Sequence, residues 1–249
     1  LGVSPARAVR LLEEIRRSSH LELCGVMTHL ASPLGALAPE TAAQIRCFQG
    51  VLEEARRGDL VRGWIHVAST AGVFTDLRPL YDAVRVGLGA YGALPADLPA
   101  SGSPAGPPEL EPVMSLRTQV VFLKDIPAGA AVGYGGTWRA ARPTRIATLS
   151  VGYADGVAWR LGNRGHVLVR GRRAPIVGTV SRDCAPVDGG HVPGVCVGDR
   201  VTLFGRDGAE RIGVEETARR AGTIPYELTC AVGRRVERVY TGGEGLGAP

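Results

Sequence analysis

The chain has 249 residues, a formal net charge of +5 and 45% hydrophobic residues. No apolar run approaches the roughly 20 residues of a membrane-spanning helix, and the basic residues are spread along the chain instead of forming one stripe. These properties argue against a membrane protein and against a nucleic-acid-binding protein. They are typical of a globular protein with one large domain or two ordinary ones.

Helix and strand patterns alternate over the first hundred residues. Ser4 is a good N-cap and Pro5 suits the first helical position, so a helix should begin here. Alternating strands and helices of this length predict a parallel sheet with crossover helices. The predicted helices cover residues 4–17 and 39–57, the predicted strands cover 21–30 and 64–69, and 78–92 is predicted as a short helix followed by a strand.

The second half of the chain has a different pattern. Short β-branched runs are separated by Gly, Pro and Asp about every ten residues, which predicts a compact all-β barrel or sandwich. One late helix is predicted over residues 213–222, ended by Gly222. The predicted organisation is an α/β domain at 1–100, a linker at 101–112 in a Pro- and Gly-rich stretch, a β-rich domain at 113–240 and a disordered tail at 241–249.

The α/β part is too short to close into a barrel on its own. A (β/α)₈ barrel takes about 250 residues, and only about half that number precedes the linker. The chain also begins in mid-pattern with Leu1 instead of Met. This favours a barrel whose front is absent over a small open α/β domain.

The five cysteines are scattered, odd in number and without a Cys-x-x-Cys pair. They predict neither a zinc site nor a disulfide framework, so no metal is expected and a reducing cytoplasm fits best.

Polar and glycine residues gather where the predicted strands end, which is where βα units place active sites. A histidine at a strand end is commonly a packed or surface residue, and a Ser-Thr-Ala-Gly turn is commonly a helix cap. The same free amides also suit a phosphate group. The spacing alone leaves both interpretations open. The candidates are His29, Ser69, Thr70, Arg85, Gly87, Leu88 and, from the β-rich half, Tyr153.

The chain resembles the C-terminal two-thirds of the alanine racemases, which use pyridoxal 5'-phosphate, in many motifs that follow one another in the same order. They include "THLAS", "HVAST", "VRVGLGAYG", "GYGGTW", "LSVGYADGVAWR" and "IPYELTCAVGRRVERVY". The resemblance implies a (β/α)₈ barrel that holds the cofactor and a β-rich domain that covers the partner subunit's site. It therefore implies a homodimer with a shared active site.

The resemblance also implies roles for the candidate residues. Tyr153 matches the tyrosine general base, which works opposite a lysine base so that two groups flank the substrate Cα. Arg85 matches the arginine at the pyridine nitrogen, and a guanidinium there keeps its proton, so the ring nitrogen stays unprotonated. His29 matches the histidine beside the ring. Thr70 and Ser69 match residues at the phosphate, although asparagine is usual at the position of Ser69. The backbones of Gly87 and Leu88 match those around the phosphate.

Three departures from the family pattern stand out. The family's cofactor-binding lysine has no counterpart here, because Lys124 is the only lysine and lies in the β-rich half. This chain alone is therefore expected to be inactive. In "VSRD" the residues predicted to bind the substrate are Arg182 and Asp183. Arg182 stands where the family has a Met whose backbone contacts the substrate carboxylate, and its side chain either adds positive charge near a carboxylate or points to solvent. Arg234 stands where some members carry an entrance tyrosine.

Two functional hypotheses follow from these residues. The first is an isomerase that interconverts L- and D-alanine and supplies D-alanine for the peptidoglycan of the cell wall, or a relative acting on another small amino acid. The second is a degenerate, non-catalytic racemase that serves as a dimerisation or binding module.

Overall fold

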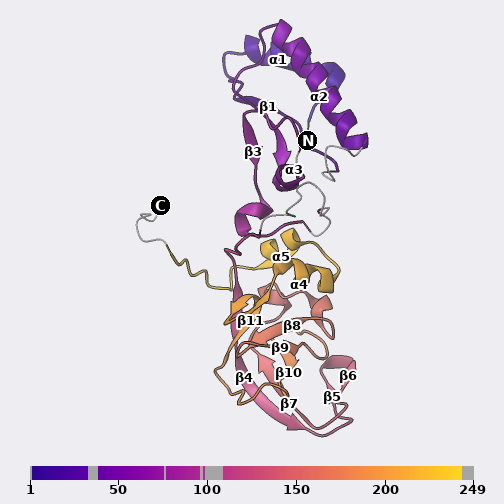
Figure 1. Cartoon of the computed structure of the whole chain (residues 1–249), viewed down its shortest axis with the longest axis vertical. Helices are drawn as coiled ribbons and strands as arrows, with labels where there is room; N and C mark the ends of the chain where they lie inside the picture. The colour runs from indigo at the N-terminus through magenta and orange to yellow at the C-terminus, as the bar shows by residue number, and fades with distance from the viewer. Residues whose placement is uncertain (1, 33–38, 76, 96–97, 99–108, 243–249) are drawn as a thin grey trace. The chain divides into compact units, whose positions relative to one another are not determined.

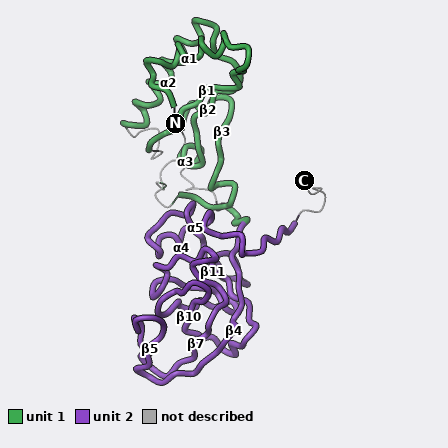
Figure 2. The backbone as a smooth tube through the Cα atoms, turned by 180° about the vertical axis from the view of Figure 1, so that it is seen from behind, with its two compact units in different colours: residues 1–113 green, residues 114–249 purple. Residues whose placement is uncertain are grey.

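The computed structural model describes residues 2–32, 39–75, 77–95, 98 and 109–242, so most of the predicted linker and the tail from 243 lie outside the described residues. The chain divides into two compact units, residues 1–113 and 114–249 (Figure 2). None of the described helices is long and apolar enough to cross a membrane.

Unit 1 is built on a parallel sheet of three strands in the order β1-β2-β3 (Figure 1). In register, Val26 of β1 lies beside Ile65 of β2, and Ser69 of β2 lies beside Arg85 of β3. The carboxyl ends of the strands therefore meet at one edge of the sheet. The elements are α1 (Pro5–Arg17), β1 (Gly25–Met27), α2 (Pro39–Arg57), β2 (Trp64–Ser69), α3 (Thr70–Phe74), β3 (Ala83–Arg85) and the 3₁₀ turn η1 (Leu88–Tyr91).

The helices of unit 1 follow the predicted apolar spacing. The α2 face that carries Phe48 and Leu52 packs with Ile65 and Val67 of β2 in one buried cluster. Leu12 of α1 packs with the far end of α2 in a second cluster. Pro5 stands at the first turn of α1 as predicted, although Ser4 makes no side-chain cap hydrogen bond.

Two predicted elements of unit 1 are wrong in detail. Strand β1 covers only three residues of the predicted 21–30. No helix precedes β3 within 78–92, and the helical turn η1 follows that strand instead. Pro79 disfavours helical geometry at Arg78, and Tyr81 has a φ of 59°, which no right-handed helix accepts.

Unit 2 is β-rich, as predicted. Seven strands form an antiparallel sheet in the order β10-β7-β4-β11-β8-β9, with β12 paired to β11. Ile176, just after β9, bridges Val187 of β10, so the two ends of this order meet. The strands are β4 (Leu116–Ile126), β5 (Ala131–Val132), β6 (Trp138–Arg139), β7 (Thr144–Leu149), β8 (His166–Val169), β9 (Arg172–Pro175), β10 (Ala185–Asp188), β11 (Arg200–Asp207) and β12 (Glu210–Ile212).

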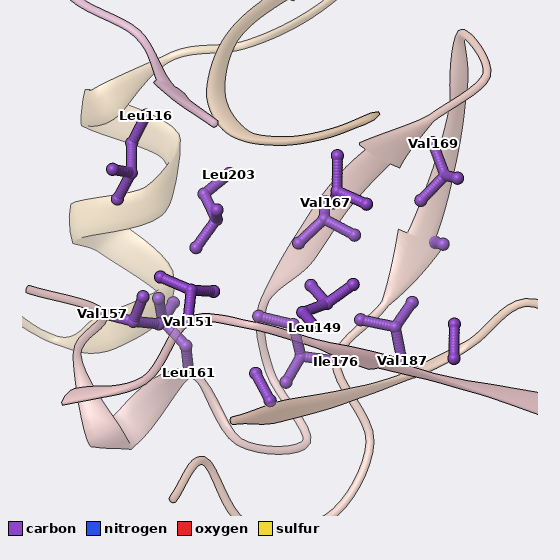
Figure 3. Close-up of a cluster of buried hydrophobic side chains, with 14 of the residues drawn as sticks. Leu116, Leu149, Val151, Val157, Leu161, Val167, Val169, Ile176, Val187 and Leu203 are labelled. Carbon is purple, nitrogen blue, oxygen red and sulfur yellow. The ribbon is translucent and has the colours of Figure 1, made fainter. Parts of the chain in front are cut away.

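The core of unit 2 lies inside this sheet. Figure 3 shows Leu149, Val167 and Val187, which come from three strands, together with Ile176, which follows β9, and all four are buried. Helix α4 (Val214–Ala221) ends at Gly222, as predicted, in a left-handed conformation. Helix α5 (Pro225–Ala231), which the sequence analysis does not predict, begins at Pro225. Short 3₁₀ turns complete the unit: η2 (Tyr134–Gly136), η3 (Tyr153–Asp155) and η4 (Trp159–Leu161).

Candidate active site

Arg85, at the end of β3, is the centre of the polar cluster in unit 1. Its Nη1 lies 2.8 Å from Nδ1 of His66, and its Nη2 lies 2.9 Å from Nδ1 of His29. Nη2 also donates to the carbonyl oxygens of Thr28 and Val67, both at 3.1 Å. The side chain is thus held by β2 and by the two residues that follow β1.

A guanidinium only donates hydrogen bonds, so a histidine that bonds to Arg85 through Nδ1 accepts with that nitrogen. Burial lowers the pKa of Arg85, but a guanidinium remains charged at neutral pH. The Nε–H of Arg85 takes part in none of the contacts given above, and it is free to donate to an acceptor such as an unprotonated ring nitrogen.

Thr70 opens α3 directly after β2 and is the second feature of this sheet edge. Its hydroxyl accepts hydrogen bonds from the amides of Gly87 at 3.0 Å and Gly89 at 3.2 Å. With both lone pairs engaged, the hydroxyl hydrogen is left for a further acceptor. Thr70 is only 1% exposed. A buried hydroxyl with an unused hydrogen suits an anion such as a phosphate oxygen.

The other predicted phosphate residues flank Thr70. Ser69 stands at the N-cap of α3 without a side-chain cap bond, so its hydroxyl is not used as an ordinary cap. Gly87 and Leu88 lie at the start of η1, where the first amides have no partner within the turn. His29 is exposed next to Arg85. The predicted cofactor residues of unit 1 therefore form two adjacent clusters on neighbouring strand ends.

Tyr153 lies on unit 2, at the start of η3, and 52% of it is exposed. Its amide donates to the carbonyl of Ser181 at 3.0 Å, and the amide of Ala154 donates to the carbonyl of Arg182 at 3.0 Å. The phenol is thus presented to solvent from a turn that is fixed to the loop at 181–184.

Arg182 and Asp183 lie in that same loop. Nε of Arg182 contacts Asp183 at 2.8 Å, and the Arg182 side chain is mostly exposed. The hydrogen bond from Arg182, followed by that from Arg235, lowers the pKa of Asp183. The hydrogen bond with Asp183 and its charge raise the pKa of Arg182, with a smaller contribution from Tyr153. Arg182 therefore pairs with its neighbour and keeps a side chain that is open to solvent.

Sequence reasoning missed three residues of these clusters. His66 holds Arg85 but reads as one more position of a buried strand, although a titratable residue between buried Ile65 and Val67 is a usable signal. Tyr134, in the "GYGGTW" motif, is a second phenol of unit 2 and is 78% exposed. Its carbonyl accepts from the Thr179 hydroxyl, so η2 is also tied to the strand-free segment that leads into 181–184. The third is Arg235, which reaches Asp183.

Comparison with known proteins matches both parts of the chain. The family model "Alanine racemase, N-terminal domain" matches residues 1–95, and "Alanine racemase, C-terminal domain" matches residues 113–240. The chain belongs to the alanine racemase family. The motif resemblance is thereby confirmed.

Relatives of known name give the same family. An alanine racemase of Symbiobacterium thermophilum is 41% identical over 247 residues, which are 98% of this chain and 63% of that protein. The biosynthetic alanine racemase of Pseudomonas aeruginosa has a TM-score of 0.82 at 36% identity, over 97% of this chain and 64% of that one. The alanine racemase of Bartonella henselae, solved with covalently bound pyridoxal phosphate, has a TM-score of 0.79 at 30% identity, over 96% and 63% of the two chains. The chain thus spans less than two thirds of the length of these racemases.

Proposed function

We propose that this chain is the larger part of an alanine racemase that interconverts L- and D-alanine with pyridoxal 5'-phosphate. In this proposal unit 1 is part of a (β/α)₈ barrel and binds the cofactor, and unit 2 is the β-rich domain that covers a partner's site. The observation that carries the proposal is the pair of clusters around Arg85 and Thr70. They sit on adjacent ends of parallel strands in a chain of the racemase family.

The residues of unit 1 fit two ends of the cofactor. Thr70 suits the phosphate, because its hydroxyl accepts the amides of Gly87 and Gly89 and keeps its hydrogen for a further acceptor. Arg85 would hold the ring end of the cofactor, and it would not protonate the ring nitrogen, because a guanidinium keeps its proton at neutral pH. When bound, pyridoxal phosphate supplies a ring that accepts the electrons left behind when the substrate Cα loses a proton. A ring whose nitrogen is unprotonated withdraws these electrons only moderately, which favours prompt return of the proton to Cα.

Racemisation also needs a proton carrier on each face of Cα. The family resemblance implies this role for Tyr153, and Tyr134 is another exposed phenol of unit 2. Both are exposed, and both turns are tied by hydrogen bonds to the segment at 179–182. A phenol has a pKa of about 10 in water, so nearby cations must assist it at neutral pH. In our proposal the phenol comes from one protomer and the cofactor cradle from the other.

The lysine that binds the cofactor is not among these 249 residues. Lys124, the only lysine, is exposed on β4 and belongs to neither cluster. We place the cofactor lysine, which is also the second proton carrier, in the part of the relatives' length that this chain does not span. The proposal further includes a cytoplasmic homodimer that acts on a small amino acid, with D-alanine passing to the peptidoglycan of the cell wall.

The test uses protein expressed from the complete open reading frame, reconstituted with pyridoxal 5'-phosphate. We expect loss of optical rotation from L-alanine and from D-alanine alike, and an absorbance band from the bound cofactor. The 249-residue chain by itself should show no racemisation. A series with serine and other small amino acids decides the preferred substrate.

The matched variant is Arg85→Ala, which should weaken the binding of the cofactor, measured by titration of its absorbance band. A non-catalytic module predicts neither racemisation nor the band from the complete protein, and that result contradicts the proposal.

A further inference from the structure

The turn that carries Tyr153, residues 152–156, is packed between two other segments of unit 2. Gly152 lies so close to the 181–184 loop that an added Cβ would be 2.2 Å from the carbonyl oxygen of Arg182. At the other end, Gly156 has a φ of +104°, and an added Cβ would be 2.7 Å from the carbonyl oxygen of Ala231. The turn therefore has the 181–184 loop on one side and the end of α5 on the other.

Asp155 is the buried anchor of this turn. Its side chain is only 11% exposed and accepts the amide of Gly152 at 2.9 Å. The same carboxylate contacts Nε of Arg235 at 3.2 Å. A carboxylate that is this buried needs a partner of opposite charge, and Arg235 provides it.

Arg235 contacts a second carboxylate through the other end of its guanidinium. Its Nη2 lies 2.8 Å from Oδ1 of Asp183, while Oδ2 of Asp183 is taken by Arg182. One guanidinium thus joins three segments that are distant in sequence: the Tyr153 turn, the 181–184 loop and the segment after α5. The planar fork of arginine suits this bridging, whereas a lysine presents a single point charge.

We infer that Arg235 is a positioning residue that fixes the Tyr153 turn against the 181–184 loop by bridging Asp155 and Asp183. For the reaction, this deepens the proposed function and rests on it. The loop carries the positions predicted for the substrate carboxylate, Arg182 and Asp183, and the turn carries a predicted proton carrier. The bridge adds side-chain contacts to the two backbone hydrogen bonds that join the turn and the loop, and misplacement by about 1 Å can cost roughly 100-fold in rate.

The first test measures hydrogen exchange of the turn and needs no activity. In Arg235→Gln, the amides of Tyr153 and Ala154 should exchange at least roughly tenfold faster, because the turn opens away from the 181–184 loop. The matched control is Arg145→Gln. It breaks an exposed ion pair with Asp125 at 2.7 Å in the same unit and should leave these amides unchanged. Unchanged exchange in Arg235→Gln overturns the inference.

The second test measures turnover in the protein from the complete open reading frame. Arg235→Gln should lower kcat by roughly 10- to 100-fold while the cofactor band keeps its wild-type intensity, because Arg235 is not part of the cradle. Arg235→Lys should restore part of the loss. A merely structural role would lower cofactor content and kcat together. Faster exchange with an unchanged kcat overturns the positioning role.

Asp183→Asn tests the same bridge independently, because it changes one of the two carboxylates that Arg235 contacts. Its effects should be non-additive with those of Arg235→Gln, because both remove the same contact. Additive effects would contradict the bridge. If the wild-type protein racemises nothing but Arg235→Gln still exchanges faster, the bridge stands and the proposed function falls, so the two failures are distinguishable.

Discussion

At the residue scale, the site in unit 1 depends on how two side chains use their hydrogen-bonding capacity. The two Nη nitrogens of Arg85 make hydrogen bonds with two imidazoles and two carbonyl oxygens, which leaves Nε–H for a ligand. The hydroxyl oxygen of Thr70 accepts hydrogen bonds from two backbone amides, which leaves its hydrogen for a ligand. In both cases the protein fixes the orientation of the side chain and leaves one donor for a ligand.

Thr70→Val is the most direct test at this scale. Valine has nearly the shape of threonine, but it leaves the amides of Gly87 and Gly89 without their acceptor. An unsatisfied buried donor costs about 1–3 kcal/mol, so urea unfolding should shift to lower denaturant. The affinity for pyridoxal phosphate should also fall, measured by titration of the cofactor band in the complete protein.

Thr70→Ser is the control, because serine keeps the hydroxyl. It should retain most of the stability and of the cofactor affinity. A valine variant that unfolds and binds cofactor like the wild type would show that the hydroxyl has no such role.

Much of this site could be predicted from the sequence, because strand ends in βα units converge. His29, Thr70 and Arg85 all fall at the predicted edge. Their partners could not be predicted in the same way. Nothing in "WIHVAS" says that His66 faces Arg85, since this depends on the register between β2 and β3. Arg235 contacts two carboxylates that are about 50 and 80 residues away, and no local pattern encodes such contacts.

At the element scale, the long periodic elements are predictable and the short ones are not. Helices α1 and α2 and strand β2 match their predicted ranges, because apolar spacing and proline position agree there. Helix α5 is missed because its seven residues are too few to show a period. Its Pro225 at the first position and Glu227 in the first turn were usable signals.

Strand β8 begins with His166, which makes the stability of unit 2 sensitive to pH. Nδ1 of His166 is buried without a hydrogen-bond partner among the described residues. Burial lowers its pKa, helped by the charges of Arg220, Arg173 and His191 and opposed by Glu216. The unfolded chain therefore binds the proton more readily, since a free histidine has a pKa of about 6.5. The contribution of the uncharged His166 to the stability of unit 2 is fully present above about pH 6.5 and is lost as the pH falls below that value.

The measurement is urea unfolding at pH 7.5 and at pH 5.5. The wild type should lose stability between the two, whereas His166→Leu should lose clearly less, because an apolar side chain has no proton to take up. Leucine is tolerable here, since the buried nitrogen makes no bond that would be lost. Equal losses in the two proteins would assign the pH dependence to other groups.

At the scale of the whole molecule, the boundary between the two units can be predicted from the sequence. The helix-and-strand alternation stops near residue 93, and short β runs follow from about 113. The structure divides at 113/114, and the two family models end and begin at 95 and 113.

The central claim is that unit 2 supplies a phenolic proton carrier to a cofactor that is cradled by Thr70 and Arg85. The most direct measurement is racemisation of L- and D-alanine, with uptake of deuterium at Cα from heavy water, by the complete protein and its Tyr153→Phe and Tyr134→Phe variants. We predict that at least one variant loses roughly 100-fold or more in rate while it keeps the cofactor band. If both variants and their double combination still racemise alanine in both directions at the wild-type rate, the phenol is not the proton carrier and the account is wrong.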